Sequence, residues 1–330
     1  MSTSLTPPAA APGFLAQVGW ADAQILPLAG DASFRRYFRV VRGADTALLM
    51  DAPPPQEDAT PFIAVSDYLV AQGFSAPAVL AADLDAGLVL IEDFGEMRMR
   101  ETLDVAPELE RPIYSDCVEL LATLATKPAM ALKPYSIAEY QRELTIFTEW
   151  YCSALSLAVD VNGYTAIWDR LLGQVVAGQA KPVTVLRDYH AENVMLVSGR
   201  TGIARLGLLD FQDALVGHPA YDLVSMLQDA RRDVSPEIET EMLVLHNRLS
   251  PHAPEFEAAY HILGVQRNLK ILGIFCRLWK RDDKPRYRAF QPRVWGYIER
   301  SIAHPALTEF KDWLNSNVPV KRRAAAWIGL

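Results

Sequence analysis

Residues 182–213 read PVTVLRDYHAENVMLVSGRTGIARLGLLDFQD, and this stretch decides the fold. It holds three apolar runs, which are Val183–Leu186, Val194–Val197 and Ala204–Leu209. Short apolar runs that contain β-branched residues and are separated by polar turns are typical of buried strands. We therefore expect three short strands, with the polar residues between them at the strand ends.

Three polar side chains at these strand ends form a chemical pattern. Asp188 is followed five residues later by Asn193, and Asp210 comes after the next turn. This is the order of a kinase catalytic loop and the metal-binding aspartate that follows it. We predict that Asp188 accepts the proton of the acceptor hydroxyl, and that Asn193 and Asp210 hold Mg²⁺ against the phosphates of ATP. The alternative is a polar turn without a catalytic role.

The same stretch carries a family resemblance. It resembles the aminoglycoside phosphotransferase and choline kinase superfamily of small-molecule kinases, in which the loop commonly reads HGDLHPGN where this chain has Leu186–Asn193. The runs DFQD from Asp210, GHP from Gly217 and YDL from Tyr221 also match that family. The resemblance implies a protein-kinase-like fold, metal binding by Asp210 and a loop-fixing role for Asp222.

A finer resemblance points to one bacterial group within this family. Residues 30–39, 50–54, 210–214 and 266–275 resemble the anomeric kinases of N-acetylmuramate and N-acetylglucosamine, and the similarity extends over most of the chain. It implies transfer of the γ-phosphate of ATP to the anomeric hydroxyl of an amino sugar during cell-wall sugar recycling. An anomeric hydroxyl is more acidic than an ordinary alcohol, so a carboxylate is an adequate base.

A polar turn near the N-terminus is the expected phosphate-covering loop. Small residues in the turn GDASF let backbone N–H groups approach phosphate oxygens. In relatives the next strand brings a Lys to the phosphates, but here that position is Met50, so we expect an arginine to carry the charge. The candidates for this role are Arg35, Arg36 and Arg39. The predicted ATP contacts are Gly30, Asp31, Ser33, Phe34, Arg35, Glu92 and Phe94.

The run Glu92–Gly95 reads EDFG and contains a literal Asp-Phe-Gly. The metal aspartate of a kinase follows the catalytic loop, whereas Asp93 lies far ahead of it. We therefore predict that this run is the hinge between two lobes, where backbone groups bind the adenine edge, and that Asp93 has no metal role.

Basic residues gather toward the C-terminal end of the chain. Nine lie between Arg267 and Arg293, accompanied only by Asp282 and Asp283. A basic wall suits a neutral or anionic acceptor better than a cationic one, and the alternative is a solvated helix face. The candidates for acceptor contact or for support of the loop are His190, Glu192, Asp213, Asp222, Arg267 and Lys270.

The fold class that these patterns predict is α+β. We expect a two-lobed, protein-kinase-like fold with a small, mainly antiparallel β N-lobe and a larger helical C-lobe. The expected boundaries are a disordered start at 1–13, an N-terminal lobe at 14–91, a hinge at 92–97 and a C-terminal lobe at 98–330. A helix from Thr60 to Gln72 is expected to be capped by Thr60 itself.

Composition limits the remaining possibilities. The net charge of -8 argues against general nucleic-acid binding, and no apolar run approaches the length of a transmembrane helix. There is no signal-peptide pattern, and three widely separated cysteines favour a reducing cytoplasm. We expect a monomer that acts on a small molecule. Two other functions stay open, which are a kinase of the same fold for another hydroxyl acceptor and a non-catalytic nucleotide-binding protein.

Overall fold

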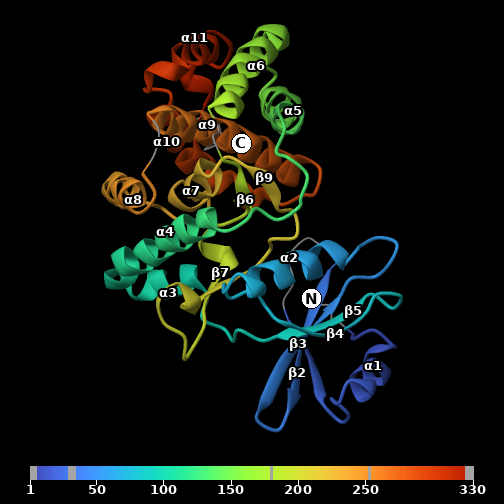
Figure 1. Cartoon of the computed structure of the whole chain (residues 1–330). Helices are drawn as coiled ribbons and strands as arrows, with labels where there is room; N and C mark the ends of the chain where they lie inside the picture. Colours follow the sequence, from blue (N-terminus) through green and yellow to red (C-terminus); the bar gives the residue numbers. More distant parts are fainter. Residues whose placement is uncertain (1–5, 29–34, 179–180, 252–253, 324–330) are drawn as a thin grey trace. The chain divides into compact units, whose positions relative to one another are not determined.

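The computed structural model describes residues 6–28, 35–178, 181–251 and 254–323. The chain forms two compact units. The first comprises Met1–Val105 with Asn193–Asp213, and the second comprises Ala106–Glu192 with Ala214–Leu330. The stretch that follows the predicted catalytic loop therefore groups with the N-terminal part of the chain. Figure 1 shows the elements of each unit along the sequence.

The first unit is built on an antiparallel sheet of five strands in the order β1-β2-β3-β5-β4. The bounds are β1 Gln24–Pro27, β2 Arg36–Arg42, β3 Asp45–Asp51, β4 Val79–Asp83 and β5 Leu88–Glu92. Alternate residues of β2, Phe38 and Val40, are fully buried against Leu49 of β3 and Leu90 of β5. This alternation is the period-2 pattern of a sheet with one buried face.

Helix α1 (Ala11–Gln17) completes this core. Phe14 and Leu15 pack with the buried face of the sheet. Because Pro12 occupies the first turn, where its missing N–H costs nothing, the helix begins inside the stretch that we expected to be disordered. The structure therefore corrects that expectation for the residues from Ala11 onward.

The first unit has further elements outside this sheet. They are the helices α2 Thr60–Ala71 and α3 Met99–Val105 and the hairpin strands β7 Val194–Leu196 and β8 Leu206–Leu208. The start of α2 differs from the expected cap: Ala59 is the N-cap residue, and the Asp58 carboxylate accepts the N–H of Thr60 at 2.8 Å. Phe62 of α2 stacks on Phe211, with 5.1 Å between ring centroids.

The second unit is mainly helical. Its α-helices are α4 Glu110–Thr126, α5 Ile137–Ile146, α6 Val161–Ala177, α7 Ala220–Leu227, α8 Pro236–Leu249, α9 Glu255–Lys280, α10 Gln291–Ser301 and α11 Thr308–Asn317. Helix α9 is the central one and is buried along most of its length. The Ser136 hydroxyl accepts the N–H of Glu139 at 3.2 Å and caps the start of α5, as the spacing of these two residues favours.

Helix α5 continues into a π-helical turn, η2 (Phe147–Cys152), where it meets α9. Gly273 of α9 makes this approach possible: a Cβ there would lie 2.4 Å from the carbonyl oxygen of Ile146. Only a glycine fits such a close contact with backbone atoms.

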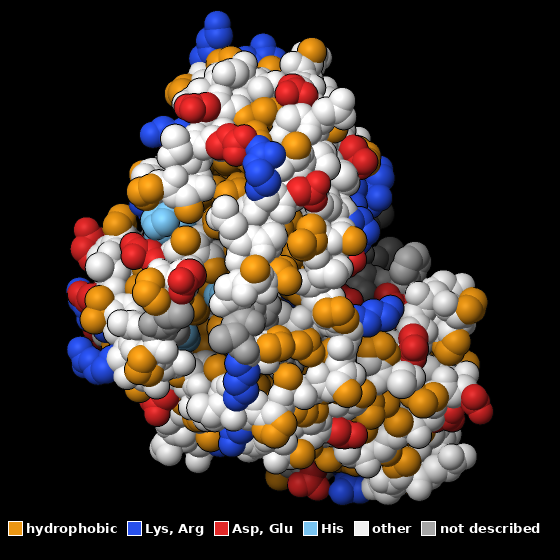
Figure 2. Space-filling view, turned by 45° about the horizontal axis from the view of Figure 1, so that its top comes forward, with side chains coloured by type: hydrophobic (Ala, Val, Ile, Leu, Met, Phe, Trp, Pro, Cys, Tyr) orange, Lys and Arg blue, Asp and Glu red, His pale blue; other side chains and the backbone are white. Residues whose placement is uncertain are grey.

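Two short strands of the second unit bracket the predicted catalytic loop. Strand β6 (Val183–Val185) pairs antiparallel with β9 (Leu215–Gly217). The antiparallel sheet of the first unit and the helical second unit confirm the predicted α+β fold. Figure 2 shows acidic and basic side chains interspersed with apolar ones over the visible face.

Candidate active site

The predicted metal ligands lie together in the first unit. The Asn193 side-chain Nδ2 donates to Oδ2 of Asp210 at 3.4 Å, and the backbone N–H of Leu209 donates to the carbonyl of Asn193 at 2.9 Å. Gln212 Nε2 donates to the other Asp210 oxygen at 2.9 Å. The β7–β8 hairpin thus fixes the two side chains beside each other.

Asp210 has the backbone and exposure expected of a ligand. Its φ is +58°, a left-handed conformation that is uncommon for a residue other than Gly, and its side chain is exposed. Such strained residues cluster at functional sites. One carboxylate and one amide oxygen fit Mg²⁺, which takes few protein ligands and completes its octahedron with phosphate and water oxygens. Asp213, which was named with the loop, is also exposed.

The three candidate arginines have different partners in the first unit. Arg36 pairs with Asp51, Nε to Oδ2 at 2.7 Å, and Arg39 pairs with Asp93, Nε to Oδ2 at 2.7 Å. Arg35 pairs with Glu57 at 3.2 Å. Met50, at the usual Lys position, is fully buried.

Tyr37 connects Arg35 with Asp210, one of the two predicted metal ligands. It interacts electrostatically with both Arg35 and Asp210, and burial together with the Asp210 carboxylate raises the pKa of its hydroxyl. Arg35 is therefore the arginine whose surroundings include Asp210, whereas Arg36 and Arg39 pair with Asp51 and Asp93. The predicted ATP contacts Gly30, Asp31, Ser33 and Phe34 lie outside the described residues.

The predicted hinge run has well-defined side-chain packing. Glu92 forms an ion pair with Arg200 at 2.5 Å, and the Arg200 guanidinium lies 5.5 Å from the centroid of the Phe94 ring. Phe94 is buried against Gly207, where a Cβ would come within 2.5 Å of the ring. The Asp93 carboxylate forms an ion pair with Arg39 and accepts the N–H of Gly95, so it has a structural role in the first unit.

In the second unit, Asp222 fixes the backbone that leads to Asp188. Its carboxylate accepts the N–H of Leu186 at 2.6 Å and the N–H of Arg187 at 2.8 Å. Burial raises the pKa of Asp222 to about 7, although these two N–H groups lower it. The contacts are those that the loop-fixing prediction requires.

Arg187 adopts a conformation that favours glycine. Its φ is +71°, and it stands where the related loops commonly have Gly. A non-glycine residue there costs about 1–2 kcal/mol. The Ser225 hydroxyl donates to the carbonyl of Arg187 at 3.2 Å, and the Arg187 side chain forms an ion pair with Glu143. These contacts offset the strain and hold the residue next to Asp188.

The end of the loop has its own anchors. The buried Asp229 carboxylate accepts the N–H of Ala191 at 3.1 Å. Arg231 contacts the Nε2 atom of His190 at 3.1 Å and pairs with Glu192 at 2.9 Å. His190 and Glu192 thus take part in one polar cluster, as expected of supporting residues. Asp229 was missed, and it lies two residues beyond the end of α7.

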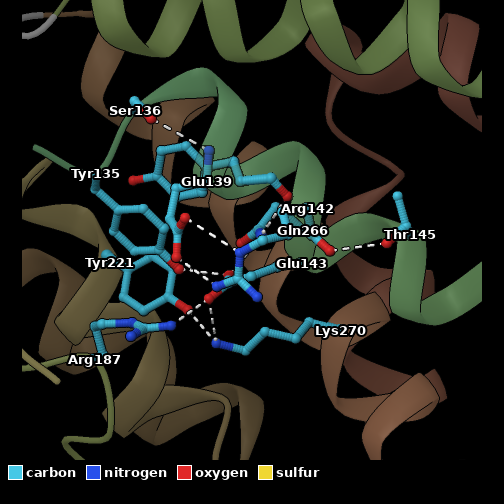
Figure 3. Close-up of polar contacts among 11 residues, drawn as sticks. Tyr135, Ser136, Glu139, Arg142, Glu143, Thr145, Arg187, Tyr221, Gln266 and Lys270 are labelled. Atoms are coloured by element: carbon cyan, nitrogen blue, oxygen red, sulfur yellow. Dashed lines mark hydrogen bonds and ion pairs between the residues drawn. The ribbon is translucent and has the colours of Figure 1, made fainter.

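A buried polar cluster lies behind Arg187, and Glu143 is its centre (Figure 3). Glu143 accepts hydrogen bonds from the Tyr135 hydroxyl at 2.5 Å, from Gln266 Nε2 at 3.0 Å and from Lys270 Nζ at 3.2 Å, besides its ion pair with Arg187. Burial would raise the pKa of Glu143, but the two cations lower it to about 2. We call these five residues and Tyr221 the Glu143 cluster. Glu143 was missed because no local pattern marks it.

The chain belongs to the phosphotransferase enzyme family, whose model matches residues 24–253. The fold, the predicted catalytic loop and the predicted metal ligands agree with this class of enzyme. The chain is therefore a kinase that transfers a phosphoryl group to a hydroxyl.

Two curated relatives have the same name. The chain is 36% identical to the N-acetylmuramate/N-acetylglucosamine kinase of Caulobacter vibrioides, over 98% of this chain and all of that protein. It is 37% identical to the enzyme of that name from Pseudomonas aeruginosa, over 90% of each chain.

Solved structures resemble the fold. A choline/ethanolamine kinase family protein from Mesorhizobium loti superposes with a TM-score of 0.59 at 15% identity, covering 93% of this chain and 96% of that one. An ADP-bound aminoglycoside phosphotransferase gives 0.56 at 13% identity, covering 86% and 95%. No helix among the described residues is long and apolar enough to span a membrane.

Proposed function

We propose that this protein phosphorylates the anomeric hydroxyl of N-acetylmuramate and N-acetylglucosamine, using ATP and Mg²⁺. The observation that carries the proposal is the identity of 36–37% over at least 90% of the chain with two kinases of these sugars. The loop of the second unit, held by Asp222 and Asp229, supports it. A cytoplasmic location, a monomeric state and a role in cell-wall sugar recycling are part of the same proposal.

Each catalytic role falls to a residue with a defined environment. Asp188 follows the backbone that Asp222 fixes. Its carboxylate would take the proton of the anomeric hydroxyl as this oxygen attacks the γ-phosphorus, while the bond from that phosphorus to the β–γ bridging oxygen breaks and ADP leaves. Asn193 and Asp210 would hold Mg²⁺, which neutralises charge on the phosphates. Arg35 would supply the positive charge that the buried Met50 cannot, and arginine suits this because it binds phosphate oxygens in a bidentate manner.

Phosphorus NMR tests the proposal directly. Purified protein with ATP, Mg²⁺ and either sugar is expected to give a sugar 1-phosphate signal, which disappears on removal of Mg²⁺ with a chelator. Asp188→Asn is expected to stay folded and to lower kcat by several orders of magnitude. Asp312→Asn is the matched control, since Asp312 is exposed on α11. ATP binding without product from either sugar would contradict the proposal.

A further inference from the structure

Lys270 is a buried cation with unused bonding capacity. Its Nζ atom donates to Glu143 Oε1 at 3.2 Å and to the Tyr221 hydroxyl at 3.1 Å. An ammonium group has three N–H donors, and among the residues that the structure describes it has these two acceptors. Its side chain is 11% exposed, whereas that of Glu143 is 2% exposed. Glu143 is thus shielded from solvent, while Lys270 keeps a small accessible surface.

Arg267 lies one turn before Lys270 on the same side of α9. It is 3% exposed, and its Nε and Nη1 atoms have no hydrogen-bond acceptor among the described residues. A buried donor left without an acceptor is costly and calls for an explanation. Its electrostatic interaction is with Asp222, which already accepts two backbone N–H groups. Arg267 therefore adds positive charge that no direct ion pair with a described residue cancels.

The cations around the loop carry more charge than the acids that interact with them. Arg187, Arg267 and Lys270 are three cations in the second unit, and Glu143 is the carboxylate that two of them share. Asp222 has a pKa of about 7, so it carries only part of a negative charge near neutral pH. Asp188 interacts electrostatically with Lys270. The nearby acids Glu139 and Glu192 have their own cations, Arg142 and Arg231, and Asp229 accepts backbone N–H groups. The positive excess therefore lies beside the predicted catalytic base.

We propose that Lys270 and Arg187 form a subsite for a carboxylate group of the acceptor, with Arg267 reinforcing the positive potential. The inference rests on the proposed function and deepens it. N-acetylmuramate carries a lactyl carboxylate that N-acetylglucosamine lacks. Comparing kcat/KM for the two sugars therefore measures how much this negative charge contributes within one enzyme. The Glu143 cluster then has two tasks, since it positions the loop and sets the charge preference for the acceptor.

The test is the ratio of kcat/KM for N-acetylmuramate to that for N-acetylglucosamine. Lys270→Met is expected to lower this ratio about 10- to 100-fold, the range for loss of one charge-assisted hydrogen bond. Lys270→Arg keeps the charge and is expected to hold the ratio within about 3-fold of the wild type. Lys280→Met is the matched control on the same helix. Lys280 is exposed and its Nζ atom lies over the Trp279 ring, so its replacement is expected to leave the ratio unchanged.

The outcomes separate the subsite from a structural role. Equal losses with both sugars in Lys270→Met would overturn the subsite, because they would mean that the cation only supports the loop. If Lys270→Met does not fold, as judged by circular dichroism, the ratio in Arg187→Met decides in the same way. Absence of product from both sugars with the wild-type protein would refute the proposed function itself, and this result differs from the equal losses in a variant.

Discussion

Replacing Glu143 by Gln removes the carboxylate that the buried Lys270 and the half-buried Arg187 share. The pKa of Glu143 is about 2 in the folded chain against a usual value of 4.5. At about 1.4 kcal/mol for each pH unit, this difference contributes about 3 kcal/mol to the free energy of unfolding at neutral pH. Because the folded-state pKa is depressed, the contribution is present above pH 4.5 and is lost as the pH falls toward 2. Removal of the acid that pairs with Lys270 and Arg187 is expected to lower the free energy of unfolding by a similar amount, about 3–5 kcal/mol.

Urea denaturation at a series of pH values measures this effect. Glu143→Gln is expected to lower the free energy of unfolding by about 3 kcal/mol at pH 7 and by progressively less below pH 4.5, until the two proteins converge. Glu149→Gln is the matched control, since Glu149 is an exposed acid a few residues further along. A constant difference between variant and wild type from pH 7 to pH 2.5 would refute the assignment of charge to Glu143.

Two further predictions concern packing and nucleotide binding. Gly273→Ala places a Cβ 2.4 Å from a backbone oxygen and is expected to lower the free energy of unfolding by about 1–3 kcal/mol or more. Gly296→Ala is the control, because its Cβ would have nothing within 4 Å, and it is expected to be neutral or stabilising. Urea denaturation measures both. Arg35→Met is expected to lower kcat/KM for ATP about 10- to 100-fold. Arg42→Met, which removes an exposed arginine of β2, is the control. Equal values of kcat/KM for ATP in the two variants would show that Arg35 does not contact the ATP phosphates.

The sequence predicts well those features that depend on local pattern. The strands at Val183, Val194 and Leu206 follow from apolar runs, and the cap at Ser136 follows from its spacing to Glu139. The loop residues were found because residue types, order and strand context agree, and their catalytic roles stay predictions. Their local geometry in each unit agrees with those roles.

Features that depend on tertiary contacts were missed. Strands β4 and β9 are short and have no distinctive alternation, and they form only because partners distant in the sequence supply their hydrogen bonds. The partners of Arg187 lie on α5 and α7, so nothing next to it in the sequence indicates Glu143. The basic residues near the C-terminus looked alike in sequence, yet Arg267 and Lys270 are buried while Lys280 and Arg281 are exposed.

The positive φ of Arg187 has an evolutionary consequence. A residue at this position either is glycine, which adopts the conformation without strain, or needs a distant acid that holds its side chain. Mutation of Glu143 alone would leave a strained, half-buried arginine without its acid. Mutation of Arg187 to glycine would leave Glu143 with Lys270 as its remaining cation. Positions 143 and 187 are therefore expected to change together during divergence, so the pair forms an epistatic unit that limits which single substitutions the loop accepts.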